Sequence, residues 1–386
     1  MTQRYAISGR RIFDGTRWHD HAALMVNNGK VEGIVGRDDV PAGTILSEDA
    51  GAMLVPGFVD LQVNGGGGVL FNDGPSVETI RTICAAHMRF GTTSVLPTLI
   101  TDTRDMTRNA IEAGVEAARA KIPGFAGIHL EGPHLSAGRK GAHSVDLIRP
   151  MDDADLKALV AARPELPALV VTCAPESVTR AQVARLAEAG IHVSLGHSDC
   201  SYRTAMAYAE AGASLVTHLF NAMSPLGHRE AGLVGAALEC GKLSAGLICD
   251  GVHVDPAAMR VALRSKTGPG RIFVVTDAMS TIGTDVTSFE LNGRRVYRRD
   301  GRLTLEDGTL AGADIDMAAS VRFLVREVGV GLDTALAMAS RDAAGAVGLS
   351  ARKGGLEAGC DADFIELDDD LQVVRTWWSG ACVHAG

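Results

Sequence analysis

The sequence predicts an α/β protein: a (β/α)8 TIM barrel with a small β-sandwich domain built from both chain termini. Three observations lead to this fold. The central region alternates eight short apolar segments with amphipathic segments, the pattern of parallel strands and covering helices. Both chain ends consist of short β-prone runs separated by turn residues. Polar residues follow several of the central strands, which favours a closed barrel over an open sheet, where ligands gather at one switch point.

The predicted domains follow this change of pattern. We assign residues 1–55 and 355–386 to the β-domain and residues 56–354 to the barrel, with a β-insertion at about 284–310. The insertion is indicated by the turn pairs Asn292-Gly293 and Asp300-Gly301. Its end, near residues 310–312, is expected to return to the pocket.

The eight expected barrel strands each begin an alternating strand–helix unit. In chain order they are Leu54–Leu61, Thr93–Leu96, Gly127–Leu130, Leu169–Cys173, Val193–Gly196, Ser214–His218, Ala245–Cys249 and Ile272–Thr276. The last two expected helical stretches, after the insertion, are Met317–Val328 and Leu332–Val347.

Composition excludes several classes of partner. The chain has 386 residues and a net charge of −9 with no basic run, so nucleic acid is not expected to bind. No apolar run resembles a signal peptide or a membrane span, so no membrane association is expected. The seven cysteines form no CxxC pair and their number is odd, which indicates a reduced, cytoplasmic protein.

Four polar residues stand at equivalent places, where an apolar strand ends. Glu131 precedes Gly132-Pro133, which cannot continue a strand, and His197, His218 and Asp277 end later segments. Any one of them could simply cap a strand. Together, one Glu and two His are the ligand types of a catalytic zinc with an open position, and Asp277 is placed as a general base beside it.

The first barrel strand carries a family resemblance. Its residues PGFVD are followed by Gln62-Val63-Asn64, and HLEGP, SLGHS, THLFNAM, DGVH and VTDAM follow in order. This series resembles the N-acetylglucosamine-6-phosphate deacetylases of the amidohydrolase superfamily. The superfamily usually has His-x-His after PGF-[VI]-D, where this chain has amides. Because amides are poor zinc ligands, Gln62 and Asn64 would leave the second metal position empty.

The resemblance implies a reaction and its residues. One divalent metal per subunit, taken as zinc, would be held by Glu131, His197 and His218. Asp277 would accept the proton of the attacking water and His143 would stabilise the oxyanion. The reaction would convert N-acetylglucosamine 6-phosphate into glucosamine 6-phosphate and acetate, in amino-sugar catabolism or cell-wall recycling.

The resemblance also implies how the amino-sugar phosphate is bound. Arg229 and His253 would bind phosphate, aided by backbone N–H groups of Asn221 and Ala222. The family forms homodimers with composite phosphate sites, so a homodimer is expected here. The remaining expected substrate contacts are Ala142, His143, Leu310, Ala311 and Gly312.

Three further features near these motifs have weaker assignments. His129 is interpreted as a packing or supporting residue beside Glu131, and His134 as a variable lining position. The glycines 65–68 do not match a phosphate-binding loop and are interpreted as a flexible loop over the pocket.

Two other functions remain open from sequence. The chain could be an amidohydrolase acting on a different N-acyl or cyclic amide substrate, or a barrel that binds a ligand without catalysis. The amides at strand one argue against the usual two-metal hydrolases. The complete set of Glu, two His and Asp argues against a non-catalytic barrel.

Overall fold

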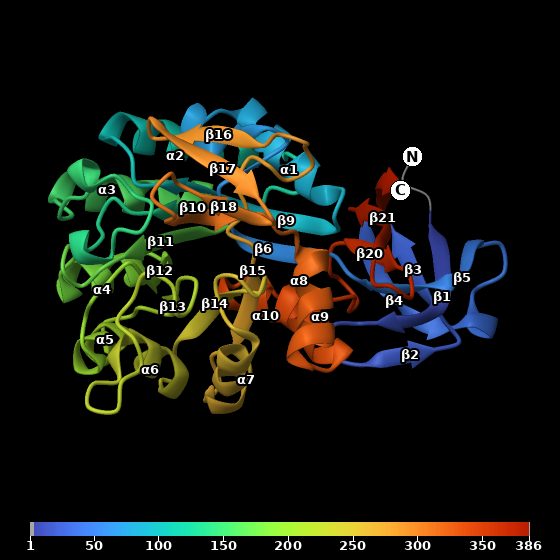
Figure 1. Cartoon of the computed structure of the whole chain (residues 1–386). Helices are drawn as coiled ribbons and strands as arrows, with labels where there is room; N and C mark the ends of the chain where they lie inside the picture. The colour runs from blue at the N-terminus through green and yellow to red at the C-terminus, as the bar shows by residue number, and fades with distance from the viewer. Residues whose placement is uncertain (1–3, 386) are drawn as a thin grey trace.

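A nearly closed barrel of eight parallel strands occupies the centre of the computed structural model, which describes residues 4–385 (Figure 1). The strands lie in chain order around the barrel, and their residues are almost all buried, as in parallel sheets covered on both faces. The strands are β6 (Phe58–Val63), β9 (Thr92–Ile100), β10 (Ile128–Glu131), β11 (Leu169–Cys173), β12 (His192–Leu195), β13 (Leu215–Val216), β14 (Ser244–Ile248) and β15 (Ile272–Val275).

The predicted barrel is therefore confirmed, with one correction at its first strand. The expected strand Leu54–Leu61 is divided, because β5 (Ile45–Pro56) belongs to the terminal sheet and β6 begins only at Phe58. Between them, the backbone N–H of Gly57 donates to the carbonyl of Asp363 at 3.0 Å. The junction between the two sheets thus falls inside what reads as one apolar run.

The first and last barrel strands are joined by backbone and side-chain contacts. The N–H of Asp277 donates to the carbonyl of Gln62 at 3.0 Å, and that of Asn64 donates to the carbonyl of Ala278 at 2.8 Å. Deeper in the barrel, the buried carboxyl of Asp60 accepts the Thr276 hydroxyl at 2.5 Å. These contacts bring β6 and β15 together directly beneath the strand-end residues.

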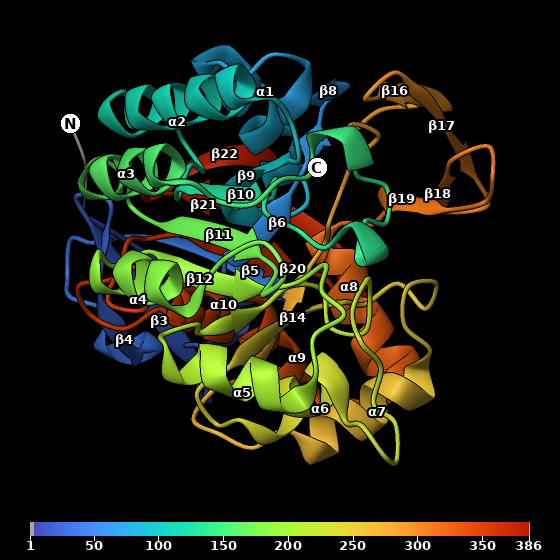
Figure 2. The same cartoon turned by 90° about the vertical axis from the view of Figure 1, so that its left-hand side faces the viewer.

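Helices surround the barrel (Figure 2). They are α1 (Val77–Met88), α2 (Arg104–Arg119), α3 (Asp153–Ala162), α4 (Arg180–Glu188), α5 (Tyr202–Glu210), α6 (Gly232–Glu239), α7 (Pro256–Ser265), α8 (Met317–Phe323), α9 (Leu332–Ala339) and α10 (Arg341–Ala346). Many begin at a side chain that accepts a backbone N–H of the first turn, which satisfies a donor without a helical partner. These capping residues are Ser76, Thr103, Asp152, Thr179, Ser201, Asp255 and Asp316.

The last helices differ from expectation. The stretch Leu332–Val347 is two helices, α9 and α10, because Ser340 between them has non-helical backbone angles (φ −134°, ψ −85°). The hydroxyl of Ser340 donates to the carbonyl of Leu336 at 2.6 Å. After α8, residues Leu324–Val328 form a π-helical turn rather than continuing as α-helix.

Strands from both chain ends form one separate sheet, which lies beyond α8 and α9 in Figure 1. Along the sheet the order is β22-β21-β20-β5-β1-β3-β4, with β2 paired to β1. Their bounds are β1 (Tyr5–Phe13), β2 (Trp18–Asp20), β3 (Ala22–Asn27), β4 (Lys30–Gly36), β5 (Ile45–Pro56), β20 (Phe364–Leu367), β21 (Val373–Trp378) and β22 (Ala381–Ala385). Phe364 and Trp377 stack across neighbouring strands, with ring centroids 4.8 Å apart.

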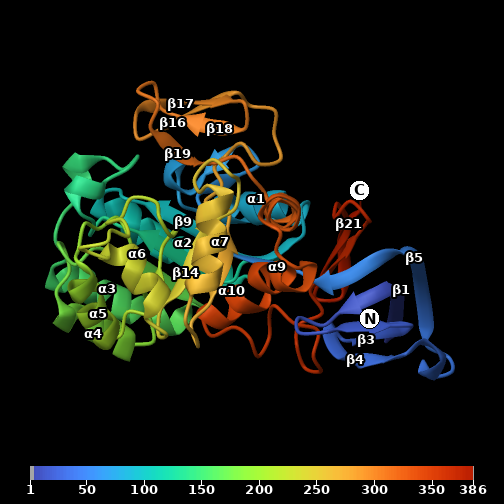
Figure 3. The same cartoon turned by 60° about the horizontal axis from the view of Figure 1, so that its bottom comes forward.

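The insertion after β15 is a four-stranded antiparallel sheet in the order β16-β17-β18-β19. Its strands are β16 (Ser288–Leu291), β17 (Arg294–Arg299), β18 (Arg302–Thr304) and β19 (Leu310–Ala313). Figure 3 shows it on a different side of the barrel from the terminal sheet.

The glycines 65–68 are not a flexible loop over the pocket. Residues Gly65–Gly66 (β7) pair with Val69–Leu70 (β8) in a small antiparallel hairpin, and Gly65 is buried. A Cβ at Gly65 would lie 2.4 Å from the carbonyl oxygen of Val69, so the hairpin requires glycine there. None of the four glycines lines the cavity described below.

Within the described part of the chain, no helix has both the length and the apolar character that crossing a bilayer requires.

Candidate active site

A cavity of about 240 Å³ opens at the carboxyl ends of the barrel strands, where TIM barrels carry their sites. It brings together most of the residues singled out from sequence. Those that line it are Asn64, Glu131, Ala142, His143, His197, His218, Asn221, Ala222, His253, Asp277, Leu310, Ala311 and Gly312. Gln62 contacts two of these residues from beneath, whereas Arg229 is exposed and does not line the cavity.

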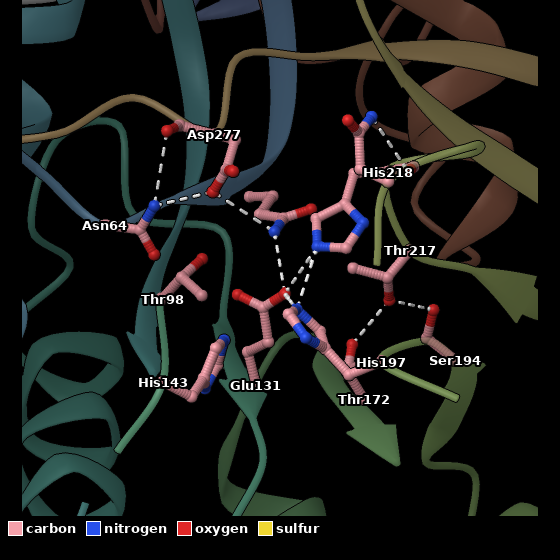
Figure 4. A network of polar contacts seen from close by, with 12 residues as sticks. Asn64, Thr98, Glu131, His143, Thr172, Ser194, His197, Thr217, His218 and Asp277 are labelled. Carbon is pink, nitrogen blue, oxygen red and sulfur yellow. Dashed lines mark hydrogen bonds and ion pairs between the residues drawn. The ribbon is translucent and has the colours of Figure 1, made fainter. Parts of the chain in front are cut away.

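Three of the lining residues present a metal-binding geometry (Figure 4). The Oε1 atom of Glu131 lies 3.1 Å from Nε2 of His197 and 3.0 Å from Nε2 of His218, and the two nitrogens are 3.1 Å apart. Ligand atoms around a tetrahedral zinc are about 3.3 Å apart, given metal–ligand distances of about 2.0–2.1 Å. The donor set and its spacing therefore fit a divalent metal.

His143 forms a wider group with two of these residues. Glu131, His143 and His197 offer ligand atoms that all lie within 4.8 Å of one another. The three atoms contributed by Glu131, His197 and His218 are much closer together. The atoms of that trio are therefore the better candidates for one shared metal, and His143 is their neighbour.

Three residues of the cavity have uncommon backbone conformations. His197, His218 and Asp277 all have positive φ angles, of 48°, 28° and 54°. Left-handed backbone is rare for residues other than glycine and concentrates at functional sites. In each case the conformation occurs just after a barrel strand, where the chain turns its side chain towards the cavity.

One of these histidines, His197, has its tautomer set by a hydrogen bond. Nδ1 of His197 lies 2.8 Å from the carbonyl oxygen of Arg139, which can only accept, so Nδ1 carries the proton. Its Nε2 lone pair is then free for a metal, an arrangement usual for metal-bound histidines. Nδ1 of His218 is buried without a hydrogen-bond partner among residues 4–385.

Glu131 is kept ionised at the centre of the site. Burial acts to raise its pKa, but hydrogen bonds and charge interactions with His197 and His218 hold that pKa well below its usual range. The side-chain amide of Gln62 also donates to Glu131 Oε1 at 3.1 Å. An ionised carboxylate is the form that binds a metal.

Asp277 faces the same cavity and is surrounded by donors. Nδ2 of Asn64 donates to its Oδ1 at 2.7 Å, and Nε2 of Gln62 does so at 3.2 Å. Burial, followed by repulsion from Glu131, raises the pKa of Asp277 to about 6 in the metal-free protein, while His218 and Asn64 act to lower it. The amides at strand one thus bind two carboxylates through their N–H groups.

His143 is held with one nitrogen pointing to Thr101. Its Nδ1 accepts the backbone N–H of Thr101 at 3.3 Å and lies 2.8 Å from the Thr101 hydroxyl. Burial and the positive neighbourhood of His197 lower the pKa of His143 to about 3, so the ring stays neutral. With Nδ1 as an acceptor, the proton is on Nε2, which makes His143 a hydrogen-bond donor to a bound ligand.

At another part of the cavity, His253 is fixed by a carboxylate. Its Nδ1 lies 2.6 Å from Oδ2 of Asp250, whose Oδ1 accepts the backbone N–H groups of Val252 and His253 at 2.8 Å each. Burial acts to raise the pKa of Asp250, but its bonds to His253 keep it lowered. Asp250 therefore positions His253, a role that was not assigned from sequence.

The histidines that flank Glu131 point elsewhere. His129 lies inside the barrel, with Nδ1 3.0 Å from the carbonyl of Leu61 and Nε2 2.7 Å from the Thr172 hydroxyl. The hydroxyl of Thr172 continues a chain of short contacts through Thr217 to Ser194, seen in Figure 4. His134 does not line the active-site cavity, which corrects the expectation, and its Nδ1 lies 3.0 Å from the carbonyl of Arg149.

Sequence reasoning did not find several residues that form or support the cavity. Ile100, Gly141, Met279, Leu291 and Thr309 line it, while Thr101 and Arg139 hold two histidines from behind. Their proximity to assigned residues was the only available signal: Gly141 adjoins Ala142, and Thr309 adjoins Leu310. The supporting contacts of Thr101 and Arg139 involve distant parts of the chain and have no sequence signature.

The barrel with its strand-end Glu and His residues is the architecture of the amidohydrolases, and comparison with known proteins agrees. The profile of the amidohydrolase family matches residues 53–383. The chain belongs to the amidohydrolase family, as the sequence resemblance predicted.

Closer relatives are named deacetylases. The chain is 39% identical, over 97% of its length and 95% of the relative, to an N-acetylgalactosamine-6-phosphate deacetylase of Shewanella sp. (strain ANA-3). It is 33% identical to an N-acetylglucosamine-6-phosphate deacetylase of Haemophilus influenzae, with 93% of each chain covered. A crystal structure of N-acetylglucosamine-6-phosphate deacetylase from Pasteurella multocida is similar with a TM-score of 0.95 and 35% identity, covering 99% of this chain and 100% of that one.

A further similar structure contains a ligand. It is a mutant N-acetyl-D-glucosamine-6-phosphate deacetylase from Mycobacterium smegmatis in complex with N-acetyl-D-glucosamine-6-phosphate. Its TM-score to this chain is 0.91 at 31% identity, with 99% of each chain covered.

Proposed function

We propose that this chain is a metal-dependent deacetylase of N-acetylated amino-sugar 6-phosphates, with N-acetylglucosamine 6-phosphate as its substrate. The observation that carries the proposal is the clustering of Glu131, His197 and His218 ligand atoms within 3.1 Å of one another, beside Asp277. The named relatives support the sugar-phosphate class.

We assign one divalent metal, zinc, to Glu131, His197 and His218. When bound, such a metal would supply Lewis acidity and lower the pKa of a coordinated water to about 7. The proton on Nδ1 of His197 and the low pKa of Glu131 keep both ligands in the form that binds a cation. Gln62 and Asn64 use their N–H groups on Glu131 and Asp277, which supports a single metal rather than two.

Asp277 moves the proton in this mechanism. It accepts a proton from the water whose oxygen adds to the acetyl carbonyl carbon. It then donates that proton to the sugar nitrogen as the C–N bond breaks, giving the amine and acetic acid, which loses its remaining acidic proton to become acetate. The donors Asn64 and Gln62 aim its Oδ1 and favour the ionised form at the start of the cycle.

His143 stabilises the charge that develops on the carbonyl oxygen. Its Nε2–H is the donor, because Nδ1 is occupied by Thr101. A fixed neutral donor in a buried site is more effective than water, since it needs no reorganisation during the reaction.

The phosphate end is formed by His253 with the backbone of Asn221 and Ala222, completed by Arg229 of a second subunit in a homodimer. Within one chain Arg229 lies in an exposed segment, residues 225–230, that also exposes Leu226 by 53%. An exposed cation and leucine in one loop are what a subunit contact would bury.

A second candidate substrate is N-acetylgalactosamine 6-phosphate, the C4 epimer. It is favoured by the relative from Shewanella, which matches at 39% identity over 97% of this chain. Both epimers carry the same acetamide and phosphate, so the assigned residues serve either one.

The test measures acetate release from both epimeric 6-phosphates and from the unphosphorylated sugars, with the metal-loaded enzyme. We expect turnover of a phosphorylated N-acetylhexosamine and a far lower kcat/KM without phosphate. Failure on both phosphorylated sugars would contradict the function, and equal activity on the free sugars would contradict the phosphate site.

We also place the protein in the cytoplasm. All seven cysteines are unpaired, and six are buried, which supports a reducing compartment.

A further inference from the structure

The turn between β16 and β17 contacts both segments that hold His143. The backbone at this turn has positive φ at Asn292 (49°) and Gly293 (71°), as a tight two-residue hairpin turn requires. Directly after it, Nη2 of Arg294 donates to the carbonyl oxygen of Ala142. Nδ2 of Asn292 approaches the carbonyl oxygen of Thr101 at 3.5 Å.

Those two carbonyls belong to the supports of the catalytic histidine. Thr101 binds Nδ1 of His143 through both its N–H and its hydroxyl, and Ala142 is the residue before His143. Apolar packing also connects the inserted sheet to these two segments. Ile100 and Ala142, the neighbours of Thr101 and His143, pack into the small hydrophobic core of the inserted sheet with Leu291.

The opposite end of the inserted sheet is anchored to the segment after Asp277. Nε of Arg298 lies 2.6 Å from Oδ2 of Asp314, whose Oδ1 accepts the Thr281 hydroxyl at 2.8 Å. The side chain of Asp314 is only 6% exposed and that of Arg298 is 31% exposed, so the carboxylate of this ion pair is shielded from water and the guanidinium is partly exposed.

The last inserted strand also touches Asp277 itself. The N–H of Ala313 donates to the carbonyl of Asp277 at 2.9 Å. Gly312 has a φ of 70°, and a Cβ there would lie 2.9 Å from the same carbonyl oxygen. One sheet therefore contacts both the residue that moves the proton and the segments that hold His143.

We propose that Arg294 and the Asn292–Arg294 turn are positioning elements that hold the Nε2–H of His143 at a fixed place relative to Asp277. The inserted sheet acts as a brace: β19 is fixed beside Asp277, and the β16–β17 turn is fixed to Thr101 and Ala142. Arg294 does not touch the substrate in this proposal, since it does not line the cavity and its Nη2 is engaged by Ala142.

This inference rests on the proposed deacetylase function, and its test includes one measurement that does not. The main variant is Arg294→Met, which keeps the length and apolar stem of the side chain but removes its donors. Arg295→Met is the matched control, because Arg295 is the next residue of β17 and is exposed. Arg294→Lys keeps one donor and serves as the conservative rescue.

For Arg294→Met we expect kcat to fall by at least about tenfold, since small misplacements of a catalytic group cost up to about 10²-fold. KM should change little, because the ground-state contacts of the substrate remain. Arg295→Met should behave as the wild type, and Arg294→Lys should recover part of the loss. A rise in KM confined to phosphorylated substrates would overturn the proposal, because Arg294 would then bind phosphate directly.

A double-mutant cycle with His143→Ala tests whether Arg294 acts through this histidine. If it does, Arg294→Met has little further effect on kcat when His143 is already absent. Fully additive losses would overturn the proposal. Should Arg294→Met fail to fold, Asn292→Ala is used in the same cycle, with a smaller expected loss.

Hydrogen–deuterium exchange of residues 137–144 gives the measurement that is independent of activity. Exchange should be faster in Arg294→Met than in the wild type and unchanged in Arg295→Met. If the wild type is inactive on every sugar, the proposed function fails while this result still tests the brace. Unchanged exchange in Arg294→Met would contradict the brace even in an active enzyme.

Discussion

The neighbours of each residue in this site set the protonation state of its side chain. Glu131 and Asp277 are both buried carboxylates in one cavity, yet their pKa values are moved in opposite directions. Two imidazoles lower that of Glu131, whereas burial and the charge of Glu131 raise that of Asp277. Environments that separate the pKa values of two carboxylates are typical of sites in which one binds and the other transfers a proton.

Replacing Asp277 tests the proton transfer. Asp277→Asn keeps the shape and removes the base, so we expect metal and substrate binding to persist and kcat to fall by about 10²–10⁴. Steady-state kinetics and metal analysis of the purified variant measure both. A metal-replete variant with near-normal turnover would show that another group transfers the proton, with His143 the first to examine.

The pH dependence of kcat/KM follows from the same group. A protonated Asp277 cannot accept a proton, so activity should fall as the pH decreases through its pKa. That pKa is about 6 in the metal-free protein, and a nearby cation lowers it, so the acid limb of the loaded enzyme should lie below about pH 6. The limb should be lost or displaced in Asp277→Asn. An acid limb that is the same in both proteins would exclude Asp277 as its source.

The proposed metal ligands give a prediction of stoichiometry. We expect one tightly bound divalent metal per chain, and His197→Ala or His218→Ala should lose most of the metal together with activity. Elemental analysis after gel filtration measures this, with the exposed His21→Ala as the control that keeps its metal. Two tightly held metals per wild-type chain would contradict the single site.

At the scale of elements, the contact between β6 and β15 decides how the barrel closes beneath the site. Asp60 is fully buried, and its carboxyl accepts hydrogen bonds from the N–H of Gln62 and from the N–H and hydroxyl of Thr276. Burial is the largest influence and raises the pKa of Asp60 to about 7, with Asp277 adding to it and the hydrogen bonds opposing it.

Asp60 should therefore make stability depend on pH. Its folded pKa of about 7 lies above the unfolded value of about 3.9, so the folded state holds an extra proton between them. The free energy of unfolding should fall as the pH rises from about 4 to about 7, by on the order of 3 kcal/mol from this group. Asp60→Asn has no proton to lose in this range, so it should not show this dependence.

Urea unfolding of the metal-free wild type and Asp60→Asn across this pH range measures the effect. The free energy of unfolding of the variant should rise relative to that of the wild type as the pH increases. Thr276→Val removes a hydrogen bond that favours the ionised carboxyl of Asp60, so the pKa of Asp60 should rise further. In that variant the fall in the free energy of unfolding should therefore extend to higher pH. Parallel curves for the wild type and Asp60→Asn would contradict the prediction.

At the scale of the whole molecule, Arg229 is the residue through which the proposed homodimer can be tested. In the single chain, Arg229 is exposed and does not line the cavity. If the phosphate site is shared, Asp277 of one subunit works with Arg229 of the other.

Co-expression of two differently tagged variants tests this directly. We expect Arg229→Ala to raise KM for the phosphorylated sugar and Asp277→Asn to lower kcat by about 10²–10⁴, so each homodimer is impaired. In a mixed dimer with shared sites, one site regains an intact Asp277 and an intact Arg229. We expect that dimer to recover up to about half of the wild-type activity, with a wild-type KM. No recovery in a verified mixed dimer would place Arg229 outside a shared phosphate site.

The sequence could predict that the candidate site residues come together in one cavity, because of the geometry of parallel barrels. The carboxyl ends of all strands meet at one rim, so Glu131, His197, His218 and Asp277 needed only to be recognised as strand-end residues. The turn at Asn292-Gly293 could also be predicted, because a two-residue hairpin turn needs two positive φ angles, which Asn and Gly adopt readily. The sequence by itself therefore determined the features that depend on neighbouring residues, namely where strands end and where a tight turn forms.

Tertiary structure alone decided the rest, because it depends on contacts between distant segments. The apolar run at residues 54–61 divides between two sheets since Gly57 binds Asp363, about 300 positions away in the chain. Arg294 meets Ala142 only because the inserted sheet folds back over the barrel rim. Thr101 sets the tautomer of His143 through its backbone N–H. Every non-proline residue has this group, so the residue type at position 101 could not predict the contact.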